Sequence, residues 1–67
     1  MSPLQLRHAR KAARVTQQQA AARLGISQAY LALLETGRRR LTDRLALKIV
    51  NLYRLPPSAL PLERAQA

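Results

Sequence analysis

The 67-residue sequence contains no cysteine, tryptophan or phenylalanine and only three acidic residues. Without cysteine there is neither a disulfide framework nor a thiolate metal site, and a reducing interior is permitted. The acids Glu35, Asp43 and Glu63 are well separated along the chain, and His8 is the only histidine. These residues form no paired-carboxylate, metal or nucleophile constellation, so the sequence predicts neither an enzyme nor a cofactor.

Long apolar runs are absent as well. No run approaches the roughly 18 residues that a membrane span needs, and the N-terminal stretch MSPLQLRHAR lacks the apolar segment of a signal peptide. We therefore expect a cytoplasmic protein with no membrane partner. A chain of this length has room for one domain, residues 1–67, with a small core.

Positive charge is what the sequence has in excess. Twelve lysines and arginines against three acids give a formal charge of +9, and the isoelectric point is about 11.8. This imbalance is typical of nucleic-acid-binding domains, so within the cytoplasm we expect the protein to be nucleoid-associated. The alternatives are a basic surface that only aids solubility, or attraction to anionic lipid.

The stretch Thr16 to Gly37, TQQQAAARLGISQAYLALLETG, predicts two short helices joined by a tight turn. Thr16 with Gln19 forms a capping box for the first helix, and Gly25 ends it because glycine adopts the left-handed conformation without strain. Ser27 caps the second helix, and Gly37 closes it. A connection this short forces the sharp crossing found in a DNA-binding helix-turn-helix.

Further helices are predicted on both sides of this pair, which gives an all-α bundle of about five short helices. The first begins near Pro3, after a Ser2 cap, and the last long one begins at Thr42–Asp43 and ends by about Arg54. One more helical turn is expected at residues 58–60, and residues 61–67 are expected to fray. The expected core positions recur at helical spacing: Leu6, Ala9, Ala13, Ala20, Ala21, Leu24, Leu31, Leu34, Leu45, Ile49 and Leu52.

Helical spacing also predicts which residues point outward. In the helix after Gly25 these are Gln28, Ala29, Ala32, Leu33 and Thr36, while Arg38, Arg39 and Arg40 follow in a basic loop placed to hold phosphates. In the last long helix, Leu47, Val50 and Tyr53 widen the apolar face beyond what one small core requires. We therefore expect part of that face to meet a second chain in a homodimer.

Several residues together resemble the phage repressor and Cro type of helix-turn-helix, also called the XRE family. The resemblance extends over about residues 4 to 60 and is carried by Thr16-Gln17, Ala21, Leu24-Gly25-Ile26-Ser27-Gln28, Tyr30-Leu31 and Leu34-Glu35-Thr36-Gly37-Arg38-Arg39. It implies sequence-specific binding of duplex DNA, commonly as a dimer on a two-fold operator. It also implies that Arg10 pairs with Glu35 as a structural brace between helices.

The resemblance implies roles at the DNA as well. Gln17 would donate to a phosphate at a helix N-terminus, Gln28 would pair with an adenine edge, and Ser27 and Thr36 would join Arg38, Arg39 and Arg40 on the phosphates. Where many relatives carry polar or basic residues, this chain has Ala29 and Leu33. These two, with Ala32, can contact only the methyl groups of thymine.

Two functions remain open from the sequence. The chain is a DNA-binding transcriptional regulator or repressor, or it is a protein-interaction module, such as the DNA-binding antitoxin of a toxin–antitoxin pair, that docks a partner through Ala29, Tyr30 and Leu33. The Arg38–Arg40 run favours the first, because a docking face has little need of it.

Overall fold

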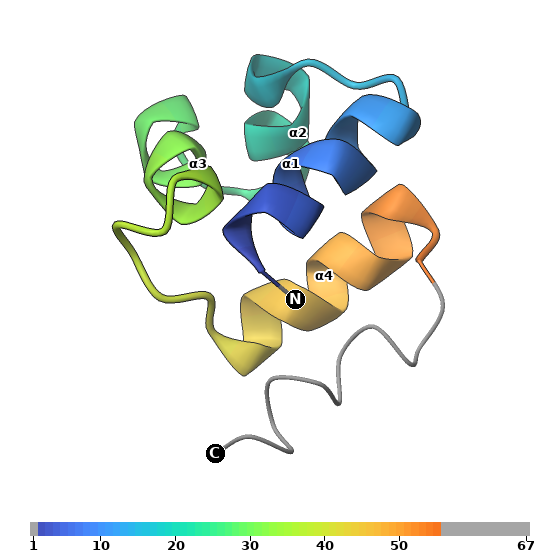
Figure 1. Ribbon diagram of the computed structural model, residues 1–67. Helices are drawn as coiled ribbons and strands as arrows, with labels where there is room; N and C mark the ends of the chain where they lie inside the picture. Colours follow the sequence, from blue (N-terminus) through green and yellow to red (C-terminus); the bar gives the residue numbers. More distant parts are fainter. Residues whose placement is uncertain (1, 56–67) are drawn as a thin grey trace.

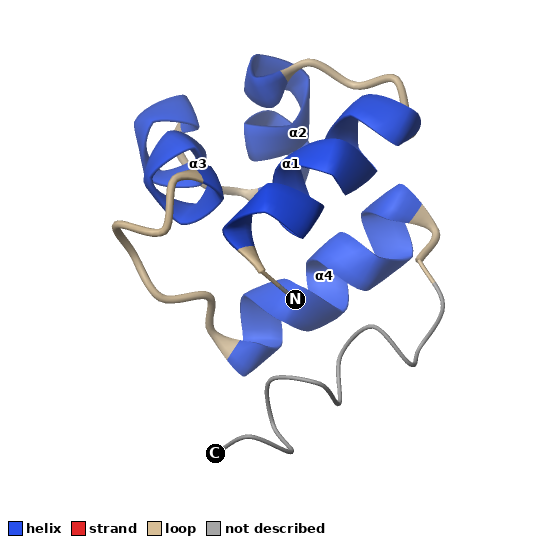
Figure 2. Cartoon of the chain, in the orientation of Figure 1, coloured by secondary structure: helices blue, strands red, loops and turns tan. Residues whose placement is uncertain are grey.

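Four helices follow one another along residues 2–55, which are the residues that this computed structural model describes. They are α1 (Pro3–Ala12), α2 (Gln17–Leu24), α3 (Gln28–Glu35) and α4 (Asp43–Tyr53) (Figures 1 and 2). The all-α prediction is confirmed over this range. The expected fifth helical turn at residues 58–60 and the expected frayed tail lie outside the described residues.

Each helix begins at a serine or threonine whose hydroxyl oxygen accepts a backbone hydrogen bond from the third residue of the helix. These pairs are Ser2 with Gln5, Thr16 with Gln19, Ser27 with Tyr30 and Thr42 with Leu45. In α1 and α2 the third residue is a glutamine, and its side-chain oxygen accepts a hydrogen bond from the backbone N–H of the cap residue. This second bond completes a capping box. The predicted helix starts are therefore confirmed, and each has a hydrogen-bonded cause.

A residue in the left-handed conformation lies one or two positions after the end of each helix, and two of these four residues are arginines. Gly25 and Gly37 have φ of 74° and 79°, whereas Arg14 and Arg54 have φ of 60° and 55°. In all four cases the next N–H bonds to a carbonyl five residues earlier, as in a Schellman motif, at 2.9 to 3.4 Å. An L-residue in this conformation costs roughly 1–2 kcal/mol. The C-termini of α1 and α4 are thus held under strain that α2 and α3 avoid.

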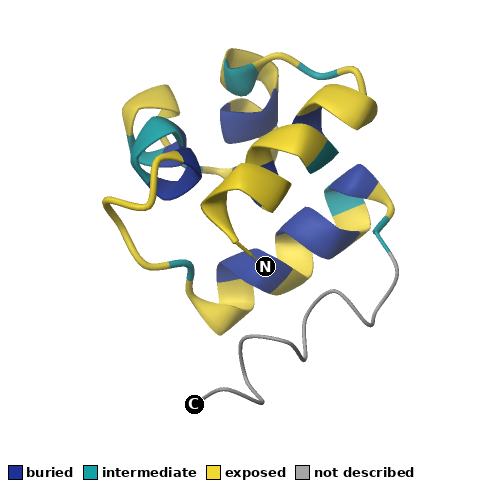
Figure 3. Cartoon of the chain, viewed as in Figure 1, coloured by how far each residue is buried: buried dark blue, intermediate teal, exposed yellow. Residues whose placement is uncertain are grey.

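The core forms where α1 and α2 each pack against both α3 and α4 (Figures 1 and 3). Leu6, Leu31 and Ile49 are fully buried at its centre. The alanines of α2, Ala20 and Ala21, are 0% and 2% exposed, so their small side chains let that helix approach its neighbours closely. The remaining buried apolar residues are Leu24, Leu34, Leu45, Ala46, Val50 and Tyr53.

The apolar width of α4 was misread from the sequence. Val50 and Tyr53, which we counted as apolar excess beyond the core, are buried in the chain's own core, and only Leu47 of that group is exposed, at 56%. The reason is that α4 packs against both α1 and α2, so it needs a wider apolar face than a helix with one neighbour. Ala9, Ala13 and Leu52 are half-buried at the edge of the core rather than within it.

Within the part of the chain that the structure describes, no helix has the length and apolar character needed to cross a membrane.

Candidate nucleic-acid interface

One side of α3 is open to solvent and carries the residues that we predicted to read bases. Gln28 and Ala29 are exposed, and Ala32 and Leu33 are half-exposed. At about 100° per residue, these side chains and Thr36 fall within an arc of roughly 140°, while Leu31 and Leu34 point into the core. The structure thus gathers the predicted base-reading residues on one surface, called here the reading face.

Behind the reading face, Arg10 of α1 and Glu35 of α3 form a buried, two-pronged ion pair. The Arg10 Nε donates to Glu35 Oε2 at 2.7 Å, and Arg10 Nη2 donates to Oε1 at 3.2 Å. The residues are only 8% and 7% exposed. The remaining prong, Nη1, donates to the Val15 carbonyl oxygen at 3.0 Å, which ties in the chain between α1 and α2. The geometry is therefore that of the expected brace.

Two glutamine amides extend this brace to the reading face. Gln17, the first residue of α2, donates from Nε2 to Glu35 Oε1 at 3.3 Å. Its Oε1 in turn accepts from Gln28 Nε2 at 3.4 Å. Because a carboxylate accepts but does not donate, Glu35 fixes which end of the Gln17 amide faces it. Gln17 then fixes the Gln28 amide, so the orientation of the reading side chain traces back to a buried charge.

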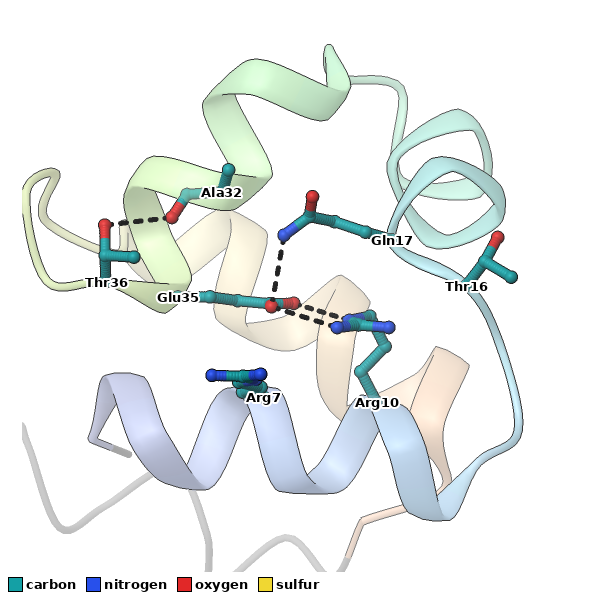
Figure 4. Close-up of a pocket in the computed structure, with 7 residues that line it drawn as sticks. All are labelled: Arg7, Arg10, Thr16, Gln17, Ala32, Glu35 and Thr36. Atoms are coloured by element: carbon teal, nitrogen blue, oxygen red, sulfur yellow. Dashed lines mark hydrogen bonds and ion pairs between the residues drawn. The ribbon is translucent and has the colours of Figure 1, made fainter.

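A pocket of about 460 Å³ opens beside this network, between α1, the N-terminus of α2 and α3. Figure 4 shows Arg7 and Gln17 reaching into it on either side of Glu35. Its lining residues are Arg7, Arg10, Thr16, Gln17, Ala32, Glu35 and Thr36. The first N–H groups of α2 have no partner within the helix and lie at its positive end. With Arg10 neutralising Glu35, the pocket has the chemistry of an anion site.

Arg7 is the residue of this site that sequence reasoning missed. It is not among the expected core positions of the first helix, and we gave it no role. The available signal was its position three residues before Arg10, because residues three apart on a helix lie side by side. Arg7 therefore belongs on the same side of α1 as the brace, next to the pocket.

The other predicted phosphate-binding residues lie at the two ends of α3. Arg38, Arg39 and Arg40 are exposed in the loop that follows it, and the N–H groups of Arg38 and Arg39 are both held by the Leu33 carbonyl oxygen. The Ser27 hydroxyl serves as the cap of α3. The Thr36 hydroxyl lies 3.0 Å from the Ala32 carbonyl oxygen, to which it donates. Both hydroxyls are thus positioned by α3 itself, at the exposed surface.

The arrangement has the geometry of a DNA-binding motif. Two capped helices are joined at Gly25, the second helix has an open reading face, and cations lie at its end. A family profile described as a helix-turn-helix domain matches residues 4–62. The chain belongs to the helix-turn-helix domain family. No curated protein and no solved structure matches it at a significant level. In this helix-turn-helix domain α2 and α3 form the motif, and DNA is the ligand that the family implies.

Among residues 2–55 of the helix-turn-helix domain, no three histidine, aspartate or glutamate side chains come together as a metal site would require.

Tyr53 is a buried polar group next to the brace. Its side chain is 6% exposed, and its hydroxyl has no hydrogen-bond partner among the described residues. The pKa of Tyr53 is raised from 10.0 to about 12, first by burial and second by the Glu35 carboxylate, while Arg10 acts in the opposite direction. An unpaired buried hydroxyl destabilises a fold by about 1–3 kcal/mol. The Tyr53 hydroxyl therefore does not add to the folding stability of the helix-turn-helix domain at neutral pH.

We expect Tyr53→Phe to leave the free energy of unfolding at pH 7 unchanged or slightly higher. A second expectation concerns alkaline pH. Because the folded pKa of about 12 exceeds the ordinary 10.0, the unfolded chain loses its tyrosine proton first. The wild type then has a stability contribution that is complete below pH 10 and declines as pH rises towards 12. Urea unfolding at pH 7 and pH 9–11 should show this decline in the wild type and a weaker one in Tyr53→Phe. A loss above about 1 kcal/mol at pH 7 would mean that the hydroxyl has a partner.

Proposed function

We propose that this domain binds duplex DNA in a sequence-specific manner, with α3 in the major groove, as a transcriptional regulator. The observation that carries the proposal is the chain of hydrogen bonds from Glu35 through Gln17 to Gln28. After donating one N–H to Gln17, the Gln28 amide keeps a second N–H and its oxygen. That pair matches the N7 and N6–H₂ groups of adenine in the major groove.

The apolar remainder of the reading face favours thymine at neighbouring positions. Ala29, Ala32 and Leu33 present only methyl and methylene groups, and the C5-methyl of thymine is the apolar feature of the major groove. Preference here depends on contact and shape rather than on hydrogen bonds. We therefore propose that the bound sequence combines an adenine opposite Gln28 with thymines beside it.

The cations around the reading face are proposed to hold the DNA backbone. Arg38, Arg39 and Arg40 flank the C-terminal end of α3, and Arg7 adjoins the pocket at the N-terminus of α2. The side-chain amide of Gln17 already donates to Glu35. We therefore assign its phosphate contact to its backbone N–H, which points out of the first turn of α2. Ser27 and Thr36 complete the set with exposed hydroxyl groups.

The experiment that tests the proposal is a salt titration of duplex affinity. With about six phosphates neutralised, log affinity should fall against log salt with a slope of roughly −5. Arg39→Ala should weaken all duplexes by a similar factor and make the slope shallower by about one unit, because phosphates look alike at every base pair. The control is Arg23→Ala, an exposed arginine about 9 Å further along α2 than Gln17, which should leave the slope unchanged. A salt-insensitive affinity would refute DNA binding through phosphates.

We also propose that the domain binds DNA as a homodimer. Two observations support the dimer. Leu47 is the exposed residue of the apolar face that we expected to meet a second chain, and the sequence resembles dimeric repressors. Two copies of α3 would sit about 34 Å apart, one helical turn of duplex. Sedimentation of the saturated complex should give two chains per duplex. One chain per duplex would show that the domain acts as a monomer.

A repressor and a DNA-binding antitoxin would both use the reading face on DNA. They differ in whether a partner protein binds the domain as well. Such a partner needs a surface that the DNA leaves open. A protein-binding site away from the reading face would therefore favour the antitoxin.

A further inference from the structure

A second hollow, of about 190 Å³, lies between the turn of the motif and the first half of α4. None of the residues that line it lines the pocket beside Glu35, and none belongs to the reading face. Tyr30, its contribution from α3, lies roughly 200° around that helix from Gln28. The hollow therefore sits on the opposite flank of α3 from the Gln17 network.

The floor of this hollow is apolar. Leu24 and Leu45 are core residues at 2% and 7% exposure that surface at its base. Ile26 and Tyr30 are half-buried and also line it. Gly25 also lines it, and a Cβ built there meets no atom within 4 Å, so the space above the turn is open. An apolar side chain entering from outside would find four apolar neighbours.

Two cations stand on the rim. Arg44 and Lys48 are exposed and line the hollow from α4, and the residues that line it include no carboxylate. At i and i+4 on one helix they repel each other, which destabilises the helix by a few tenths of a kcal/mol. The overall charge of +9 adds to that repulsion. Carboxylates brought by a partner would relieve it, so the rim is complementary to an acidic ligand.

We propose that this hollow docks an acidic segment of a partner protein, in which a leucine or phenylalanine side chain fills the hollow and flanking carboxylates pair with Arg44 and Lys48. Nucleic acid fits the rim but not the floor, because phosphates gain nothing from an apolar hollow. A second copy of this chain would bring like charge to the rim. The proposal does not depend on DNA binding, and a partner held here leaves the reading face free.

The test uses the full chain and a displayed library of 12-residue peptides with one leucine or phenylalanine flanked by acidic residues. The control library has serine at the apolar position. The best selected peptide is labelled, and its affinity is measured by fluorescence anisotropy for the wild type, Lys48→Glu and Arg23→Glu. The last two make the same charge change on exposed helix positions, and only Lys48 lines the hollow. Affinity for duplex DNA is measured in the same proteins.

We expect the selected peptide to lose about tenfold or more in affinity when its apolar residue becomes serine. Lys48→Glu should weaken it about tenfold, Arg23→Glu should weaken it much less, and DNA affinity should respond alike to both. Equal losses in the two variants would show general charge attraction and overturn the proposal, as would equal enrichment of the serine library. A loss of DNA affinity confined to Lys48→Glu would assign the rim to nucleic acid instead. A DNA-free dimer that Lys48→Glu dissociates would assign it to a second copy.

Discussion

Replacing Glu35 with alanine should lower the free energy of unfolding by about 3–5 kcal/mol, because it leaves the Arg10 guanidinium buried without its partner. Arg10 is 8% exposed, and Val15 would be its one remaining acceptor among the bonds that it makes here. A domain of this size has a total stability of only about 3–10 kcal/mol. The loss is a large share of that total, so unfolding of the variant should be measured in urea at low temperature.

A double-mutant cycle separates the pair from its surroundings. The cycle consists of Arg10→Met, Glu35→Leu and the variant that carries both changes. The double variant removes both charges and should recover most of the stability, since a buried ion pair is often replaced by apolar residues at little cost. Arg23→Ala, at an exposed position, is the control and should change stability by no more than about 0.5 kcal/mol. We expect the single changes to reduce stability more than sequence discrimination. A coupling energy near zero would leave Arg10 and Glu35 without a bracing role.

Gln28→Ala should cost about 1–3 kcal/mol in affinity for the preferred duplex, while affinity for scrambled duplex should change little. The residue is exposed at the first position of α3, and its amide is held by Gln17 for an adenine edge. No charge is lost, so the slope of log affinity against log salt should stay the same. Fluorescence anisotropy with both duplexes at several salt concentrations measures all three quantities.

Gln18→Ala is the matched control, because Gln18 is an exposed glutamine on α2 outside the hydrogen-bond network described above. It should alter neither discrimination nor the salt slope. If Gln28→Ala instead lowers affinity for both duplexes by the same factor, Gln28 contacts the backbone. Base recognition would then have to come from Ala29, Ala32 and Leu33 against thymine methyl groups.

The helix boundaries could be predicted because their causes are local. A serine or threonine at the cap, a glutamine three residues on and a glycine after the last apolar residue are all visible in the sequence. The left-handed Arg14 and Arg54 were not visible in this way. At these positions the hydrogen bonds at the C-terminal ends of α1 and α4 offset the backbone strain.

The parts that could not be predicted depend on tertiary packing. Val50 and Tyr53 gave the same apolar signal as Leu47, and only the position of α4 against two helices decides which are buried. In the site, outward positions on α3 followed from helical spacing, and the Arg10–Glu35 pair followed from family resemblance. The bonds from Gln17 to both Glu35 and Gln28 join residues 18 and 11 positions apart. They depend on the detailed packing of α2 against α3, which the predicted sharp crossing alone does not determine.

The central claim is that α3 reads bases through an amide held by the buried brace. Its most direct test is selection of bound duplexes from a random DNA pool, carried out in parallel with the wild type and Gln28→Ala. The wild type should enrich a short shared motif that contains a required adenine, and Gln28→Ala should relax that position while the rest of the motif persists. Folded wild-type protein that enriches no shared motif, or a variant that enriches the same motif with the same strictness, would contradict the account.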